Sequence, residues 1–212
     1  MDKANPSFIV GIGGSAGGLK AYTTLLNALP SNTGMAFVFI AHMSPTGKSL
    51  LAHLLSKSTN MPVVQTTDGM RVLANHVYVI PPNVDLFIED YAFKTVSPRT
   101  LNQGRHHQVD SFLRSLAQAV GDHAIAIILS GGDGDGTEGC KFVKSKGGIT
   151  FAQDLSADVE SMPLHAEASG CVDLILPPDK IAAELIKIGE LFSTEVNTAR
   201  SSVLKVGQRM EI

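Results

Sequence analysis

Acidic residues are missing from the first third of this 212-residue sequence, in which no Asp or Glu lies between Asp2 and Asp68. Several lysines, among them Lys20 and Lys57, lie in the same stretch. Any carboxylate that serves a site in this part of the protein must therefore come from later in the chain. Over the whole sequence the formal net charge is only -3, so neither nucleic acid nor an acidic lipid surface is an expected partner.

Cysteines and long apolar runs are also scarce. The two cysteines, Cys140 and Cys171, are too few for a disulfide framework. The N-terminus lacks the pattern of a signal peptide, and the longest apolar runs, such as 35–41, are much shorter than the roughly 20 residues that span a bilayer. With 44% hydrophobic and 17% charged residues, the composition is typical of a packed protein. These features predict a cytoplasmic protein that does not insert into the membrane.

Short β-rich apolar runs alternate with segments of helical periodicity, which is typical of parallel strands joined by right-handed crossovers. Residues 68–96 differ, because short β runs there are separated by turn sequences and predict antiparallel hairpins on one edge. We therefore expect an α/β fold with a single doubly wound, mostly parallel sheet, helices on both faces and a small antiparallel hairpin edge. The main strands are expected at 8–12, 35–40, 63–66, 124–129, 149–152 and 172–176.

The end of the sequence is polar. The last helical pattern runs from Ile181 to Leu191, and from Ser193 onward no clear periodicity remains. We expect residues 1–192 to form one domain and residues 193–212 to form an irregular polar tail or the start of a linker.

A glycine-rich turn at 11–18 follows the first expected strand and precedes the first expected helix. Gly11, Gly13 and Ala16 match the dinucleotide-binding fingerprint G-x-G-x-x-G/A. That fingerprint also needs an acid after the second strand to hold a ribose hydroxyl, and this chain has His42 there. The second half of a dinucleotide site is therefore missing.

The same turn also matches G-x-S-x-G, through Gly13, Ser15 and Gly17. A nucleophile on a sharp strand-to-helix turn needs small neighbours, and the helix N-terminus behind it offers N–H groups for a developing oxyanion. The motif is short, and Ser15 could equally cap the helix or belong to an anion site. The turn alone does not separate these interpretations.

A serine nucleophile needs a base and a group that orients the base, and such groups gather at the carboxyl ends of strands in an open α/β sheet. His42 directly follows the second expected strand, although a single histidine is more often structural. Asp133 and Asp135 lie in a glycine-rich loop after the strand at 124–129. These two acids could instead bind a metal ion, but the further oxygen ligands of a calcium loop are missing. Three strand ends that carry Ser, His and Asp favour a hydrolase.

In this combination the sequence resembles the catalytic domain of the chemotaxis protein-glutamate methylesterase family, the CheB type, from about residue 8 to residue 191. The resemblance implies that Ser15 is the nucleophile, that His42 is the base and that Asp135, rather than Asp133, orients it. The matching motifs are Gly11-Ile12-Gly13-Gly14-Ser15-Ala16-Gly17-Gly18, Ala41-His42-Met43, Asp68-Gly69-Met70-Arg71-Val72-Leu73, His76-Val77-Tyr78-Val79-Ile80-Pro81-Pro82, Val109-Asp110, Leu129-Ser130-Gly131, Gly134-Asp135-Gly136, Ala152-Gln153-Asp154 and Met162-Pro163.

The resemblance also implies the reaction, which is hydrolysis of glutamate 5-methyl esters on the cytoplasmic helices of chemoreceptors with release of methanol. Members of the family can also deamidate receptor glutamines. The implied partners are methylated chemoreceptor cytoplasmic domains, with a methyltransferase or sensory modules in the same pathway or chain. No cofactor and no metal are implied. Backbone N–H groups near Ala16 are expected to hold the oxyanion, with Gly14 and Gly132 beside the site.

Two departures from the family pattern have consequences. Gly132 stands where Met or Thr is common, and Gly134 stands where Ser is common, so the loop before Asp135 is expected to be more flexible. Well-known members carry a receiver domain before the esterase, whereas here the resemblance begins within ten residues of Met1. This is similar to a subgroup in which the esterase starts the chain, and control by phosphorylation of the same chain is then not expected.

Two other classes of function stay open. One is a dinucleotide-binding domain, against which the missing acid after the second strand counts. The other is a non-catalytic sensory or scaffold module that keeps the fold, against which the intact Ser15, His42 and Asp135 count.

Overall fold

Apolar runs rich in Val, Ile and Phe form one large sheet, because such side chains pack well on a pleated surface that is buried on both faces. The computed structural model describes residues 5–44, 49–100 and 107–207. Its seven-stranded sheet has the order β3-β4-β2-β1-β7-β8-β9, and all neighbouring strands are parallel. The strands are β1 (Ile9–Gly14), β2 (Ala36–Ala41), β3 (Val63–Gln65), β4 (His76–Val79), β7 (Ala124–Ile128), β8 (Ile149–Gln153) and β9 (Leu174–Leu176).

The central strand β1 is the point at which the strand order reverses. Strands β2, β4 and β3 extend the sheet on one side, and β7, β8 and β9 extend it on the other. Gly14 of β1 lies opposite Ala41 of β2, and Gly13 lies opposite Ile128 of β7. In an open parallel sheet the crevice at such a switch point is the usual binding site. The carboxyl ends of β1, β2 and β7 meet at this crevice.

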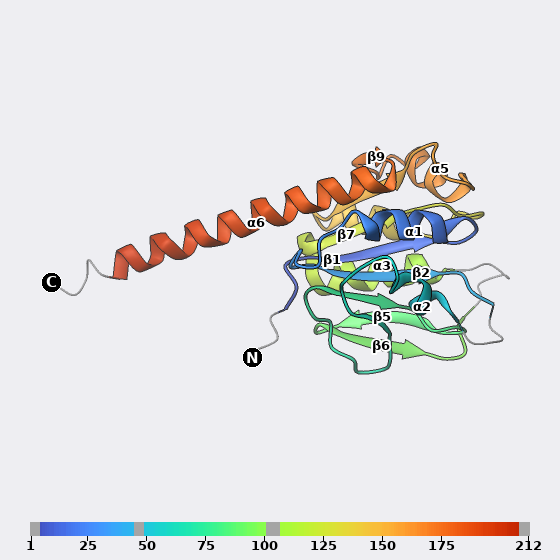
Figure 1. Ribbon diagram of the computed structural model, residues 1–212, viewed down its shortest axis with the longest axis horizontal. Coiled ribbons are helices and arrows are strands. Elements are labelled where there is room, and N and C mark those ends of the chain that lie inside the picture. Colours follow the sequence, from blue (N-terminus) through green and yellow to red (C-terminus); the bar gives the residue numbers. More distant parts are fainter. Residues whose placement is uncertain (1–4, 45–48, 101–106, 208–212) are drawn as a thin grey trace.

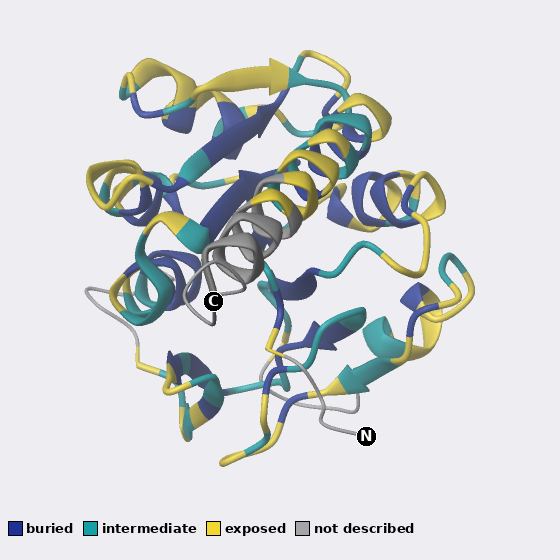
Figure 2. Ribbon diagram, turned by 90° about the vertical axis from the view of Figure 1, so that its left-hand side faces the viewer, coloured by how far each residue is buried: buried dark blue, intermediate teal, exposed yellow. Residues whose placement is uncertain are grey.

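Helices cover both faces of the sheet (Figure 1), as predicted. The β2 side chains show why, since Phe37 and Phe39 belong to one buried cluster while Val38 and Ile40 belong to the other. Figure 2 shows the buried strands between the helices. One face is covered by α1 (Gly18–Asn27), α2 (Leu51–Leu55) and α6 (Pro178–Gly207), and the other by α3 (Gln108–Val120), α4 (Thr137–Ser145) and α5 (Ser161–Ala168). The expected doubly wound α/β fold is confirmed.

The antiparallel hairpin is also confirmed, but its surroundings differ from the expectation. Strands β5 (Asp85–Glu89) and β6 (Ala92–Val96) form a separate two-stranded sheet, and Leu86 and Phe93 pack in the same cluster as Phe112 of α3. The expectation that β4 also belongs to a hairpin is wrong, because β4 pairs in parallel with β2 and β3. A four-residue apolar run indicates a strand, but its partner here lies some forty positions away in β2.

Helix α6 continues well past Leu191, where its helical pattern was expected to end. The expectation of irregular chain from Ser193 onward is wrong, because α6 reaches Gly207 and projects beyond the other elements (Figure 1). No Pro or Gly interrupts the sequence between Gly189 and Gly207, and each residue added to an existing helix gains a hydrogen bond. Polarity alone therefore does not end this helix.

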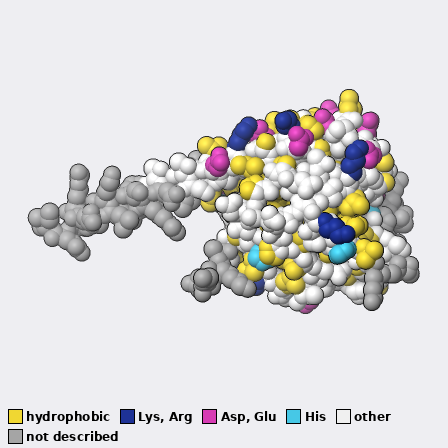
Figure 3. Space-filling view, in the orientation of Figure 1, with side chains coloured by type: hydrophobic (Ala, Val, Ile, Leu, Met, Phe, Trp, Pro, Cys, Tyr) yellow, Lys and Arg dark blue, Asp and Glu magenta, His cyan; other side chains and the backbone are white. Residues whose placement is uncertain are grey.

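Two findings for the described residues concern membrane insertion and surface charge. None of their helices combines the length and the hydrophobicity that crossing a bilayer requires. On the face shown in Figure 3, positive and negative side chains are interspersed among the coloured residues. This distribution agrees with the small net charge of -3.

Candidate active site

Ser15 stands on a tight turn between β1 and α1. Gly17, the N-cap of α1, has a φ of 74°, a left-handed conformation that favours glycine. A side chain at Gly17 would also meet Ser130 Oγ at 2.5 Å. The Ser15 N–H donates to the Ser130 carbonyl at 2.9 Å, which ties the turn to the loop after β7. Ser15 is half-buried, so it lies at the border between the protein interior and the solvent.

His42 is the first residue after β2, at the same level of the sheet as Ser15. Gly14 and Ala41 lie opposite each other in β1 and β2. Ser15 and His42, which follow them, therefore stand at the ends of two neighbouring strands. Such strands lie about 4.8 Å apart. The His42 side chain is only 6% exposed, and its Nε2 lies 2.7 Å from Asp135 Oδ2. The structure thus joins His42 to Asp135 and places Ser15 at the end of the neighbouring strand.

Asp135 is held by the first turn of α3. Its Oδ2 accepts the Val109 N–H at 3.0 Å, and its Oδ1 accepts the Asp110 N–H at 2.9 Å. The first N–H groups of a helix have no partner within the helix, and the positive end of the helix dipole favours a carboxylate. This contribution of α3 was not anticipated from the sequence. The one available signal was the predicted start of a helix at Val109-Asp110.

A second carboxylate, that of Asp133, lies at the other ring nitrogen of His42. Its Oδ2 is 3.3 Å from His42 Nδ1, and its side chain is 42% exposed. Burial by itself lowers the pKa of His42, but the hydrogen bonds and charges of Asp133 and Asp135 outweigh burial and raise this pKa to about 9. Both acids that were expected in this loop therefore contact His42, one at each nitrogen.

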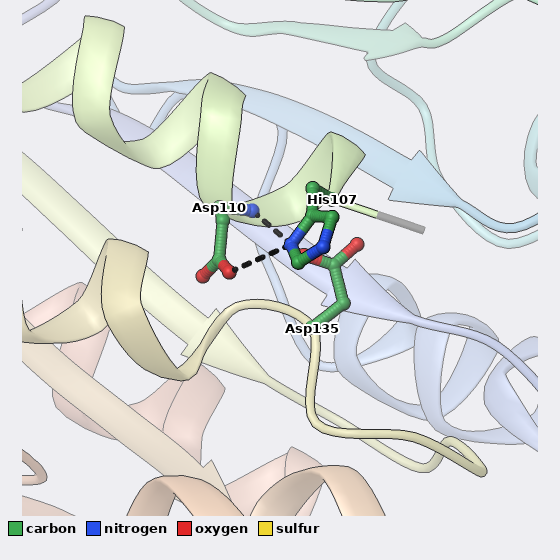
Figure 4. A group of neighbouring side chains, drawn as sticks. All are labelled: His107, Asp110 and Asp135. Atoms are coloured by element: carbon green, nitrogen blue, oxygen red, sulfur yellow. Dashed lines mark hydrogen bonds and ion pairs between the residues drawn. The ribbon is translucent and has the colours of Figure 1, made fainter. Parts of the chain in front are cut away.

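The acidic groups around Asp135 also bear on the metal interpretation. Among the described residues, ligand atoms of His107, Asp110 and Asp135 lie within 4.8 Å of one another (Figure 4), whereas Asp133 does not belong to this group. The oxygens of Asp135 already accept hydrogen bonds from α3 and contact His42. Asp110 Oδ1 accepts the Gly139 N–H at 2.7 Å. Hydrogen bonds within the protein therefore account for both oxygens of Asp135 and one oxygen of Asp110.

An apolar cavity opens beside Ser15. Its volume is about 310 Å³, and its lining includes Leu19, Tyr22 and Leu54. The Tyr22 hydroxyl is buried and has no hydrogen-bond partner among the described residues. A more open groove of about 790 Å³ also starts at Ser15 and extends over α1 and α2 toward Lys57. A peptide segment can therefore reach the serine from the surface.

The residues that were expected around the oxyanion differ in their exposure to solvent. Gly14 is the buried last residue of β1, whereas Ala16 and Gly132 are exposed. The Ser15 N–H already donates to Ser130 O. The Ala16 N–H has no acceptor among the described residues, so it is available to a bound molecule.

Comparison with known proteins gives a family match over most of the chain. The model of the family described as CheB methylesterase matches residues 10–185. A relative from Leptospira interrogans is 32% identical over 181 residues, which cover 84% of this chain and 93% of that protein. The protein-glutamate methylesterase/protein-glutamine glutaminase of Nitrosospira multiformis is 30% identical over 189 residues, 89% of this chain. This chain spans only 53% of that longer relative.

A solved structure shows the same fold. The catalytic domain of the Thermotoga maritima CheB methylesterase superimposes with a TM-score of 0.78 and is 28% identical. The match covers 87% of this chain and 100% of that domain.

Proposed function

Because this chain belongs to the CheB methylesterase family, we propose that it hydrolyses glutamate 5-methyl esters on the cytoplasmic helices of chemoreceptors and releases methanol. The proposal is supported by the contact between His42 and Asp135, together with the position of Ser15 and His42 after the neighbouring strands β1 and β2. The relatives' names pair a methylesterase with a glutaminase. Deamidation of receptor glutamines is therefore part of the proposal.

In the proposed mechanism, Asp135 orients the base. Its hydrogen bond with Nε2 keeps a proton on that nitrogen, so the lone pair of a neutral His42 lies on Nδ1. Nδ1 removes the proton from Ser15 Oγ, which attacks the ester carbonyl carbon. The tetrahedral intermediate collapses, and the leaving methoxide takes the proton from His42. Water that His42 deprotonates then attacks the acyl-enzyme and releases glutamate and Ser15.

The oxyanion of the intermediate needs N–H donors that are in place beforehand. The Ala16 N–H is our main candidate, since it follows the nucleophile and has no acceptor among the described residues. Gly132, exposed in the loop after β7, is the candidate for the opposite side. The apolar cavity beside Ser15 suits the aliphatic part of a methylated glutamate and its neighbours.

We extend the proposal to the setting of the enzyme. Residues 1–192 would form the catalytic domain, with residues 193–212 as a polar extension, and the family match at residues 10–185 supports this division. Methylated receptor domains lie in the cytoplasm, so the enzyme would act there. A methyltransferase that installs the esters, or sensory modules of the same pathway or chain, would be its other partners.

The test is release of methanol from receptor membranes that carry radiolabelled methyl groups. The wild-type protein should release label, and Ser15→Ala should reduce release to residual oxyanion-hole catalysis. Ser145→Ala, an exposed serine on α4, serves as the matched control. Wild-type protein that is folded but releases no methanol would favour a scaffold module. Saturable binding of NAD or NADP would favour the dinucleotide alternative.

A further inference from the structure

Asp133 and Asp135 hold His42 from opposite sides, but the two acids are anchored differently. The Asp135 side chain is 0% exposed and accepts two N–H groups from α3. The Asp133 side chain is 42% exposed, and its Oδ1 accepts the Asp135 N–H at 3.1 Å. A Cβ at the neighbouring Gly132 would meet nothing within 4 Å, so there is room around this part of the loop. Asp135 is thus the buried partner of His42, whereas Asp133 is the partner that borders the solvent.

The contacts of His42 define its protonation state. A neutral imidazole has one N–H donor and one acceptor nitrogen, and an ionised carboxylate only accepts. Carboxylate oxygens lie 2.7 Å from Nε2 and 3.3 Å from Nδ1, so both contacts are favourable only when both nitrogens carry protons. The arrangement therefore stabilises the imidazolium.

A His42 ring that carries protons on both nitrogens cannot act as the base. With Nε2 bonded to Asp135, the nitrogen left for Ser15 is Nδ1, and Asp133 lies on that nitrogen. A protonated Nδ1 cannot accept the proton of Ser15 Oγ. The serine and Asp133 thus need the same nitrogen of the same ring.

We infer that Asp133 is a positioning residue that competes with Ser15 for Nδ1 of His42. In the free enzyme it keeps His42 protonated, until bound substrate displaces the Asp133 carboxylate from Nδ1. The inference rests on the proposed function and concerns how its base is controlled. Substitution of Asp133 leaves the other charged groups near the ring in place. His107 and Asp110 adjoin Asp135 at the start of α3, and Arg99 Nη1 donates to the carbonyl of Met43, the residue after His42.

The kinetic test is the pH dependence of kcat/KM, which reports ionisations of the free enzyme. With a His42 pKa of about 9, only about 3% of the free enzyme has a neutral ring at pH 7.5. Asp133→Asn keeps an oxygen for the Asp135 N–H but removes the charge. We expect this variant to raise kcat/KM at pH 7.5 on the order of tenfold, with a plateau above pH 9.5 similar to that of the wild type. Glu160→Gln, at an exposed residue just before α5, removes the same charge and should leave the profile unchanged.

A second measurement does not depend on esterase activity. Titration of the His42 ring protons by NMR, with the resonance assigned through His42→Gln, should give a pKa near 9 in the wild type. The titration should move to lower pH in Asp133→Asn, and also in Asp133→Ser if the Asn variant folds poorly. An unchanged titration in the folded variants would overturn the inference. A lower pKa without methanol release from any protein would support the inference and refute the proposed function instead.

Discussion

Replacement of Asp135 by Asn is the sharpest test of the proposed catalytic arrangement. The substitution keeps the shape of the side chain but leaves one acceptor oxygen where two stood. In the wild type these oxygens accept the Val109 and Asp110 N–H groups and contact His42 Nε2. The amide NH2 of an asparagine must take one of two places. It faces the Asp110 N–H if it replaces Oδ1, or both the Val109 N–H and His42 Nε2 if it replaces Oδ2.

The magnitude follows from which donor the NH2 group faces. If it replaces Oδ1, the buried Asp110 N–H loses a charge-assisted hydrogen bond, which costs about 1.5–3 kcal/mol of unfolding free energy. If it faces the ring, Nε2 must become the acceptor and Nδ1 takes the proton. Ser15 then meets an N–H in place of a lone pair. The corresponding change in a known Ser-His-Asp triad lowers kcat about 10⁴-fold, and we expect a loss of this order.

The assay combines methanol release with urea denaturation, so that a loss of activity is separated from a loss of folding. Asp133→Asn is the matched control, because it makes the same chemical change two residues away on the other nitrogen of the same ring. Asp135→Asn should nearly abolish turnover, and Asp133→Asn should not. If Asp133→Asn abolishes turnover and Asp135→Asn lowers it less than tenfold, the assignment of the orienting acid is wrong.

Three further predictions concern stability. Gly17→Ala should destabilise the protein by about 1–3 kcal/mol in urea denaturation and should lower turnover. The substitution adds a Cβ to a residue with positive φ, and this Cβ would lie against Ser130 Oγ. An unchanged denaturation midpoint would contradict the geometry of the turn. Tyr22→Phe removes a buried hydroxyl that has no partner in the part of the chain that the structure describes. Thermal unfolding should therefore show equal or up to about 1 kcal/mol higher stability, and a clear loss would mean that the hydroxyl has a partner. The His42 pKa of about 9 lies above its unfolded value, so its stabilisation is complete below about pH 6.5 and is lost as pH rises through 9. The loss should reach about 3 kcal/mol in wild type and less in Asp133→Asn, as followed by urea denaturation at several pH values.

Much of the fold could be predicted because its signals are local. The strands β1, β2 and β7 are unbroken apolar runs followed by glycine or polar residues, and α1 and α3 repeat their apolar residues with helical spacing. The partner of β4 could not be predicted, because a run of four residues fits a hairpin and a parallel sheet equally well. The length of α6 was missed for a related reason. Val196, Ala199, Val203 and Val206 keep helical spacing there, but they lie among polar residues, and no Pro or Gly interrupts them.

The candidate site could also be predicted only in part. Ser15, His42 and Asp135 each follow a strand, so the sequence indicated that they meet, and the resemblance to a family indicated their roles. The sequence did not indicate that α3 anchors Asp135, since this contact joins residues 25 and 26 positions apart. It also did not indicate that Asp133 and Asp135 lie on opposite nitrogens of His42. That arrangement depends on how a glycine-rich loop turns, and glycines leave its path undetermined from sequence.

The central position of β1 has a consequence for synthesis on the ribosome. Its partner on one side, β2, emerges soon after it, so Ser15 and His42 can come together early. Its partner on the other side, β7, begins at Ala124, which pairs with Ile9 across 115 positions of sequence. At about 5–20 residues per second, several seconds pass before that strand is available. During this interval the nascent chain carries the proposed nucleophile and base without the proposed orienting acid, so we expect it to stay inactive until most of its sheet has been made.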